Sequence, residues 1–337
     1  MLGNRPIDEA VFAEELDPWL PSKVIDCHVH VSLSEHRSAV SPERMSINWA
    51  REVSSEQSWE QMRQTWNALF PGREVRALAF GVPFREVDLI ANNDYILRGV
   101  RDPANMASGL LLTRPDWEPA AIEDAMRAGF LGIKPYPDLA PESIDEPGIF
   151  DFVPRAQLEV VNRLGGILML HLPRKDRLAD ADNIRDLLEI SDSFPSIRLI
   201  LAHVGRSFCL PTAQRGLPSF ARRSNVYFDT AANLNADVFA YAIEVVGPDR
   251  ILYGSDLPIT LMRGFRGHVG ETYINYTDGP YSWNVNRKSP AEEARYTYYL
   301  YEELRALIDA AKRSGVGKAA LEKVLYSNAA KLLGGPA

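Results

Sequence analysis

Eight short apolar segments, separated by helical ones, are the sequence feature that most limits the possible folds of this chain. They are rich in β-branched and aliphatic residues, and most read as strands buried on both faces, as in a parallel sheet. They occupy residues 24–31, 75–82, 106–112, 131–135, 167–172, 197–203, 226–229 and 251–255. An alternation of strands and helices predicts an α/β fold. Eight repeats favour the closed (β/α)8 barrel.

The same alternation also occurs in open, doubly wound sheets, which are the alternative fold. Such sheets commonly carry a Gly-rich phosphate-binding loop directly after the first strand. No such loop follows residue 31 in this sequence, which also sets aside a nucleotide-dependent oxidoreductase. We therefore expect a single (β/α)8 barrel domain over residues 1–337, a length that barrels of this kind reach as one domain.

Two segments are too long to be plain connections. Residues 32–71 are polar, carry Trp49, Trp59 and Trp66, and follow the first strand, whereas residues 262–290 are rich in Gly, Tyr, Arg and Asn and follow the eighth. Long segments after barrel strands usually lie over the C-terminal mouth, where binding sites are built. We interpret both as insertions over that mouth.

Composition narrows the partners of this chain. A net charge of -8 argues against nucleic acid, which needs clustered Lys and Arg. No apolar run is long enough to span a membrane, and the acidic start of the chain does not resemble a signal peptide. Cys27 and Cys209, the two cysteines, suggest no disulfide scaffold. A cytoplasmic protein with a small-molecule partner is expected.

Polar side chains gather at the ends of the predicted strands. The first strand ends with His28 and His30, which alternation places on one face, about 7 Å apart. Later strands end with Lys134, His171, His203, Asp229 and Asp256. Each residue alone has a structural explanation, such as a core histidine, a salt-bridged lysine or a turn aspartate. Four of the six histidines at one rim of a barrel, however, predict a metal site there.

Strand alternation also assigns the neighbours of these residues. On the first strand, Ile25, Cys27 and Val29 are expected on the outward face, opposite His28. Asp26 is expected on the face of His28, one layer deeper. There it would either hold a metal ligand from behind or form an ion pair at the bottom of the core.

Five motifs carry a resemblance to a known family. They are Ile-Asp-Cys-His-Val-His at 25–30, Gly-Ile-Lys-Pro-Tyr-Pro at 132–137, Leu-Ala-His-Val-Gly at 201–205, Leu-Tyr-Gly-Ser-Asp-Leu-Pro at 252–258 and Ser-Asn-Ala-Ala-Lys-Leu-Leu-Gly at 327–334. Together they resemble the amidohydrolase superfamily, and within it the amidohydrolase-related (amidohydrolase 2) branch of metal-dependent TIM-barrel hydrolases and decarboxylases. The resemblance covers residues 22–335 but matches neither insertion to a subgroup.

The chemistry of these residues agrees with the roles that the resemblance implies. His28, His30, His171 and Asp256 are expected to bind one divalent ion, Zn²⁺ by ligand type, with Mn²⁺ as the alternative. Asp256 would also be the general base, and His203 would contact the water or the substrate oxygen. In binuclear members of the superfamily a carbamylated lysine on strand four bridges two ions. Lys134 and His203 would serve a second ion in that case, but we favour one metal.

Substrate contacts are expected from residues just beyond the strand ends. Arg174, Arg206 and Tyr136 are the candidates, and the two arginines would hold a substrate carboxylate bidentately. Exposed loop arginines are the alternative interpretation of Arg174 and Arg206.

The resulting hypothesis is a metal-dependent hydrolase that uses a metal-activated water on a lactone or amide of a small organic acid. Non-oxidative decarboxylation of an aromatic or unsaturated acid is the alternative, because it uses nearly the same site. A catalytically inactive metal-binding barrel is the third reading, and it predicts the loss of a ligand position. Such barrels are often homo-oligomers, so the tryptophan-bearing insertion suits either subunit packing or the pocket.

Overall fold

Eight parallel strands pair in chain order in the computed structural model, which describes residues 3–334. Residues 1–2 and 335–337, the ends of the expected domain, lie outside the described residues. The paired runs are β1–β2–β3 and β4 through β8. Their bounds are β1 Lys23–His30, β2 Glu74–Phe80, β3 Ala107–Gly109, β4 Gly132–Ile133, β5 Ile167–Leu170, β6 Arg198–Leu201, β7 Val226–Asp229 and β8 Ile251–Leu252.

Hydrogen bonds just beyond the short strands close these two runs into one ring. Between β3 and β4, Leu111 N donates to Gly132 O over 3.0 Å, and Lys134 N donates to Leu111 O over 2.8 Å. Between β8 and β1, Cys27 N donates to Tyr253 O over 2.8 Å, and further bonds join residues 256–257 to 28–30. The (β/α)8 barrel expected from the sequence is therefore confirmed.

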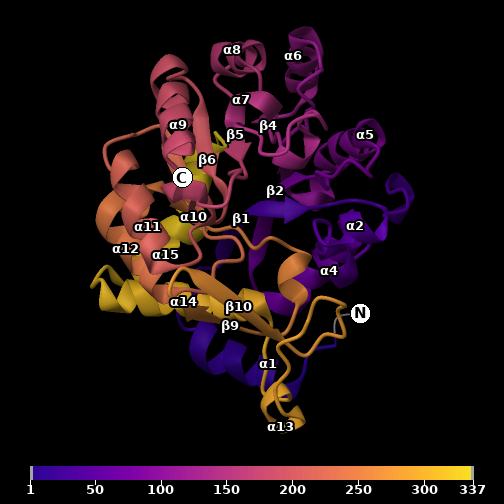
Figure 1. Cartoon of the computed structure of the whole chain (residues 1–337). Helices are drawn as coiled ribbons and strands as arrows, with labels where there is room; N and C mark the ends of the chain where they lie inside the picture. Colours follow the sequence, from indigo (N-terminus) through magenta and orange to yellow (C-terminus); the bar gives the residue numbers. More distant parts are fainter. Residues whose placement is uncertain (1–2, 335–337) are drawn as a thin grey trace.

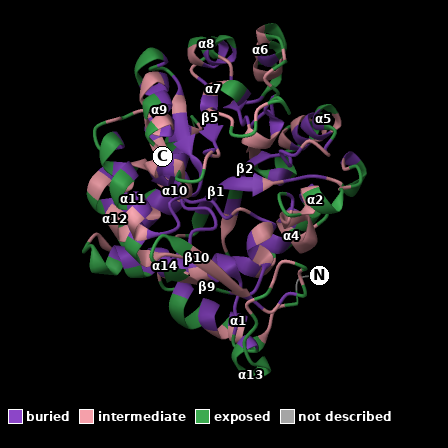
Figure 2. Cartoon of the chain, in the orientation of Figure 1, coloured by how far each residue is buried: buried purple, intermediate pink, exposed green. Residues whose placement is uncertain are grey.

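Helices surround this ring (Figure 1), and their outward surfaces are the exposed ones while the strands are buried (Figure 2). The outer helices are α5 Leu89–Val100, α6 Pro119–Ala128, α8 Arg155–Arg163, α9 Ala181–Ser193, α11 Leu210–Gly216, α12 Ala236–Val246 and α14 Tyr299–Arg313. The other helices are α1 Pro6–Val11, α2 Pro42–Met45, α3 Ala50–Val53, α4 Trp59–Leu69, α7 Ile149–Phe152, α10 Ala202–Arg206, α13 Pro290–Glu293, α15 Gly317–Glu322 and α16 Asn328–Leu332. Across residues 3–334, none of the helices combines the length and apolar character needed to cross a lipid bilayer.

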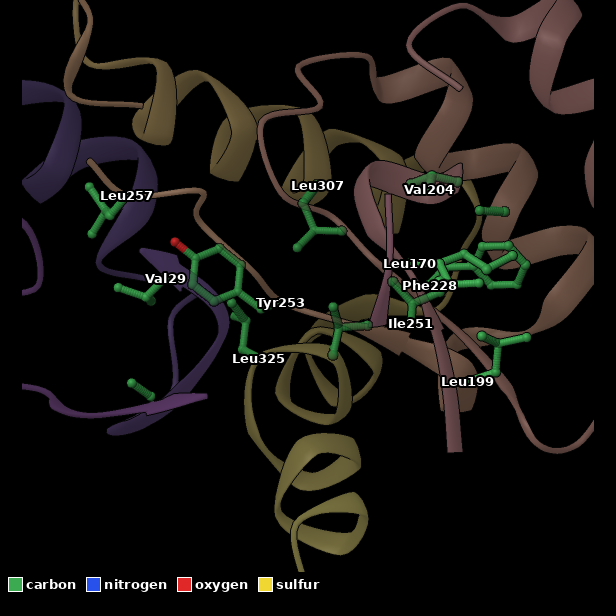
Figure 3. Close-up of a cluster of buried hydrophobic side chains, with 14 of the residues drawn as sticks. Val29, Leu170, Leu199, Val204, Phe228, Ile251, Tyr253, Leu257, Leu307 and Leu325 are labelled. Atoms are coloured by element: carbon green, nitrogen blue, oxygen red, sulfur yellow. The ribbon is translucent and has the colours of Figure 1, made fainter. Parts of the chain in front are cut away.

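Two apolar layers hold the barrel together. Inside the ring, side chains such as Phe80, Met169 and Ile200 form one buried cluster that residues of α16 close. Outside it, the other faces of the strands pack against the helices, as Leu307 of α14 does beside the strand residues in Figure 3. Each fully buried side chain of this size contributes about 1.5–3 kcal/mol of transfer free energy, so the two layers fix which strand face looks inward.

A β-bulge in β1 overturns the predicted facing of its residues. Asp26 pairs with Ala77 and Val29 pairs with Ala79, so β1 uses three steps where β2 uses two. Ile25 and Cys27 consequently lie in the inner cluster, whereas the alternation had placed them outside. Asp26 pairs with an outward-facing alanine, so its expected place on the inner face is also wrong. It does support the site from behind, because its Oδ1 accepts hydrogen bonds from His28 N over 3.2 Å and from Ser255 N over 2.8 Å.

Both long segments reach the mouth of the barrel. Residues 32–71 contain α2, α3 and α4, and residues 262–290 contain the antiparallel hairpin of β9 Gly264–Val269 and β10 Thr272–Thr277. The two segments touch, because Ser282 N donates to Glu52 Oε2 over 2.6 Å and the rings of Trp49 and Trp283 lie 5.2 Å apart. The hairpin was not predicted, although Gly270 between two β-forming runs is a recognisable turn signal.

Glu303 of α14 is a buried carboxyl group behind the barrel mouth. Its side chain is 0% exposed, and it accepts hydrogen bonds from Thr230 Oγ1 at 2.8 Å and Ala232 N at 3.0 Å. Burial raises the pKa of Glu303 well above its usual range, although these two hydrogen bonds act in the opposite direction. The folded chain therefore keeps a proton that the unfolded chain releases above about pH 4.3.

This proton makes the free energy of unfolding fall as the pH rises, by about 1.4 kcal/mol per pH unit between the unfolded and folded pKa values. Glu303→Gln mimics the neutral acid, so we expect its stability relative to the wild type to grow between about pH 5 and about pH 7. Urea denaturation at both pH values measures this. Glu60→Gln, on the exposed face of α4, is the control. If the free energy of unfolding depended on pH in the same way in the wild type and in Glu303→Gln, the raised pKa of Glu303 would be contradicted.

Candidate active site

A cavity of about 640 Å³ opens at the C-terminal ends of the strands. Its floor carries His28, His30, His171, His203 and Asp256, which belong to β1 or lie within four residues after the ends of β5, β6 and β8. Residues 44–51 of the first insertion and Arg266, Tyr273 and Asn275 of the hairpin form part of its walls. The barrel thus brings together side chains that are more than 200 positions apart in the sequence.

Asp256 faces both histidines of β1. Its Oδ1 lies 3.5 Å from His28 Nε2 and 3.3 Å from His30 Nε2. Gly254 makes this approach possible, because a Cβ there would lie 2.7 Å from the Cβ of His28. Asp256 itself has φ +60°, a left-handed conformation that Asp tolerates better than most residues.

Three of the four imidazoles on the cavity floor are held by their Nδ1 atoms. His28 Nδ1 lies 3.0 Å from Asp229 Oδ2, His30 Nδ1 lies 2.9 Å from Gly81 O, and His203 Nδ1 lies 2.7 Å from Ala231 O. Carbonyl and carboxylate oxygens accept, so each Nδ1 donates a proton, and in the neutral ring that a metal requires each Nε2 keeps its lone pair. For His28 and His30 that lone pair faces Asp256.

These spacings suit a shared ion better than direct hydrogen bonds. A charge-assisted N–H···O bond is about 2.7–2.9 Å long, shorter than both Nε2–Oδ1 separations. Nitrogen and oxygen ligands placed tetrahedrally around Zn²⁺ are about 3.3–3.5 Å from one another. His28, His203 and Asp256 also form a group whose ligand atoms all lie within 4.8 Å of one another. The donor set therefore fits a divalent cation.

His203 begins an unusual left-handed turn. The φ angles of His203, Val204, Gly205 and Arg206 are 57°, 52°, 64° and 60°. Such a conformation costs free energy for a β-branched residue such as Val204, and strain of this kind concentrates at functional sites. Asp229 helps to hold the turn, because its Oδ1 accepts a hydrogen bond from His203 N over 2.6 Å.

His171 and Lys134 lie at the edge of this group. The ring of His171 is 5.3 Å from that of His203, and its Nε2 is 3.4 Å from the Tyr136 hydroxyl. The buried atoms His171 Nδ1 and Lys134 Nζ have no hydrogen-bond partner among residues 3–334. Lys134 Nζ instead lies 4.6 Å from the centroid of the Phe80 ring. Two unsatisfied buried nitrogen atoms beside the histidines are further signs of a site built for a ligand.

Burial sets the charge state of the site. It lowers the pKa of His28 and of His171 well below the usual range, with the nearby cations Lys134 and Arg206 adding to the effect. It also lowers the pKa of Lys134 to about 8, against the attraction of Asp229 and Asp256. Burial opposes ionisation of Asp256, but contact with His30 and the other histidines outweighs it and lowers that pKa. Neutral imidazoles beside a carboxylate are the protonation states that a metal requires.

The three predicted substrate residues have different surroundings. Arg206 and Tyr136 line the cavity, and Arg206 Nη1 donates to Leu172 O over 2.7 Å. Within residues 3–334, Arg174 does not line the cavity. Its Nη1 instead forms an ion pair with Asp182 of α9 over 2.8 Å. The expectation that Arg174 reaches the substrate is therefore not supported by its position.

Sequence reasoning gave no role to Asp229, although it noted this residue at the end of the seventh strand. The structure shows that its carboxylate joins His28 to the backbone of His203. It also did not single out Arg266 and Tyr273, because residues 262–290 were interpreted only as an insertion over the mouth and not as a hairpin. A polar residue ending an apolar strand was the available signal for Asp229.

The chain belongs to a known family of enzymes. Residues 25–335 match the family described as Amidohydrolase, which confirms the resemblance read from the five motifs. The fold and the histidine-rich mouth thus define a divalent-metal enzyme of the amidohydrolase type. A search of curated proteins gives no match.

Solved structures with the same fold include hydrolases and decarboxylases. A probable 2-pyrone-4,6-dicarboxylic acid hydrolase from Acinetobacter baumannii with citric acid bound is 16% identical with a TM-score of 0.58, covering 92% of this chain and 99% of that one. A 2,6-dihydroxybenzoate decarboxylase complexed with 2,6-dihydroxybenzoate is 15% identical with a TM-score of 0.57, covering 93% and 100%. A dihydroxybenzoic acid decarboxylase from Polaromonas sp. JS666 with bound manganese is 15% identical with a TM-score of 0.55, covering 93% and 97%. Identities this low establish the shared fold.

Proposed function

We propose that this protein is a metal-dependent hydrolase that cleaves a lactone or amide of a small organic acid. The observation that carries the proposal is the meeting of Asp256 Oδ1 with the Nε2 atoms of His28 and His30 at 3.5 and 3.3 Å. His171 completes the proposed ligand set, supported by its buried Nδ1 without a partner in residues 3–334. We assign one ion per chain.

A divalent ion held by these residues supplies Lewis acidity, which polarises a carbonyl and lowers the pKa of water. Asp256 stays ionised, and because its Oδ1 faces both imidazoles, its other oxygen is left to accept a proton from the attacking water. His203 Nε2, fixed as an acceptor by the Nδ1 bond to Ala231, orients that water. The same two groups can return a proton to the leaving oxygen or nitrogen.

Zn²⁺ is the proposed ion because three imidazoles and one carboxylate suit it. Mn²⁺ is the alternative, supported by the manganese bound in the Polaromonas decarboxylase. We place the protein in the cytoplasm on the basis of its thiols: Cys27 and Cys209 are both buried and unpaired in the described chain.

Arg206 and Arg266 in the cavity wall support an anionic small molecule as the partner. Non-oxidative decarboxylation of an aromatic acid is the second candidate reaction. It is favoured by the likeness to the decarboxylase complexed with 2,6-dihydroxybenzoate. In that reaction His203, rather than orienting a water, would carry a proton on Nε2 and deliver it to the carbon that loses CO₂.

Turnover measurements separate these reactions. We expect the metal-loaded protein to hydrolyse at least one member of a panel of lactones and amides of small acids. Chelation should abolish the activity and Zn²⁺ or Mn²⁺ should restore it, because ligand removal takes away the Lewis acid. Elemental analysis should give one ion per chain.

CO₂ release from hydroxybenzoates, together with no hydrolysis of the panel, would replace the proposal with the decarboxylase. Close to two ions per chain would contradict the single-metal assignment and give Lys134 a bridging role.

A further inference from the structure

Three arginines lie close together on one side of the cavity, the side that His171 and Phe208 border. Arg266 of β9 and Arg206 line the cavity, and Arg177 contacts Arg206 and the aromatic rings beside Arg266. The guanidinium carbon of Arg266 is 4.8 Å from the Phe208 ring centroid and 4.5 Å from that of Tyr273. That of Arg177 is 5.3 Å and 5.6 Å from the same two centroids. Both cations therefore share one pair of aromatic rings.

None of these three arginines is within 4.0 Å of a carboxylate oxygen in residues 3–334. Arg206 donates to Leu172 O and accepts Arg177 Nη1 at its own carbonyl, over 3.3 Å. Arg266 donates to Ala232 O over 2.6 Å and to Asn275 Oδ1 over 2.9 Å. Neighbouring like charges disfavour one another, so a cluster of this kind is unfavourable until an anion enters.

Two other arginines of the cavity wall, in contrast, form ion pairs with carboxylates of the chain. Arg44 pairs with Glu86 and Asp138, both at 2.6 Å, and Arg85 pairs with Glu142 at 3.3 Å. Neutralised arginines of this kind brace the mouth. The Arg206–Arg266 side instead keeps its positive charge for something that is not part of the chain.

The cluster is connected to the metal-binding histidines through one aromatic ring. The Phe208 ring centroid is 6.0 Å from that of His203 on one side and 4.9 Å from that of Tyr273 on the other. Arg266 and Tyr273 are both carried by the β9–β10 hairpin. Phe208 also lines the cavity, so a molecule that spans from His203 to Arg266 can pack on its apolar ring.

We propose that Arg266 and Arg206 form a carboxylate-binding subsite separate from the metal, and that the β9–β10 hairpin thereby sets substrate specificity. This inference rests on the proposed function for the position of the reacting group. The substrate is an acid whose ionised carboxylate lies at one end and whose hydrolysed carbonyl lies at the other, with an apolar spacer over Phe208. Arg177 strengthens the positive potential there.

Binding of benzoate and of its neutral isostere benzamide tests the subsite without any turnover. Isothermal titration of the metal-loaded and the chelator-treated wild type should show benzoate bound more tightly than benzamide in both states. Arg266→Gln should weaken benzoate about tenfold to a hundredfold, as expected for a lost hydrogen bond to a charged group, and leave benzamide unchanged. Arg215→Gln, which removes an exposed ion pair to Glu271 in the hairpin turn, should change neither.

Three results would overturn the proposal. Benzoate affinity in Arg266→Gln equal to that of the wild type would show that Arg266 holds no anion. Equal losses for benzoate and benzamide, or equal losses in Arg266→Gln and Arg215→Gln, would show that the hairpin matters only for packing. A preference for benzoate that disappears on chelation would place the carboxylate on the metal. Because the experiment measures binding alone, each of these results can be interpreted even if the protein shows no hydrolase activity.

Discussion

Replacing Asp256 with asparagine is expected to lower kcat on the hydrolysed substrate by about a thousandfold or more. The change removes the proposed proton acceptor and, among residues 3–334, the only negative charge in contact with the Nε2 atoms of His28 and His30. Asparagine is nearly isosteric and tolerates the φ of +60° at this position. The loss should therefore come from chemistry and not from misfolding.

The measurement is kcat with metal content determined on the same preparation. Asp145→Asn is the matched control, because Asp145 lines the rim of the same cavity but is exposed and contacts no histidine of the floor. We expect this control to keep wild-type activity. An Asp256→Asn protein that retains kcat to within about tenfold would show that Asp256 is not the general base.

The barrel could be predicted from the sequence because its determinants are local. Each strand is an apolar run, and the eight runs recur with helices between them, so periodicity alone gives their order and number. The bulge in β1 could not be predicted, since it is a mismatch between residues 26–29 of one strand and 77–79 of its partner. Pairing register is a property of two segments, and a single strand carries no record of it.

The candidate site shows the same division. His28, His30 and Asp256 were predicted because strand ends meet at one rim, whatever the details of the barrel. Arg174 and Arg206 each lie three positions after a histidine, yet only Arg206 lines the cavity. The difference arises from the left-handed turn after His203 and from Asp182, which pairs with Arg174. Neither can be read from spacing.

Asp229 is the residue whose importance only the structure reveals, and it carries the second large expected effect. As a carboxylate it can only accept, so Oδ2 fixes the proton of His28 on Nδ1 while Oδ1 accepts from the backbone N–H groups of His203 and Ala231. One side chain thereby sets the tautomer of one histidine and the position of another.

Asp229→Asn should therefore disturb the metal site without unfolding the barrel. The amide oxygen can still serve the two backbone N–H groups, which leaves the NH₂ group facing His28 Nδ1. His28 must then accept at Nδ1 and carry its proton on Nε2, the atom that faces Asp256. We expect metal affinity to fall about tenfold to a hundredfold, as for other residues that orient a metal-binding histidine. Competition with a chelating dye measures this affinity.

Glu303→Gln, at a buried carboxyl group that contacts no histidine, should bind metal as the wild type does. An unchanged metal affinity in Asp229→Asn would show that the lone pair on His28 Nε2 is not needed for metal binding. The close approach of His28 to Asp256 would then need another explanation.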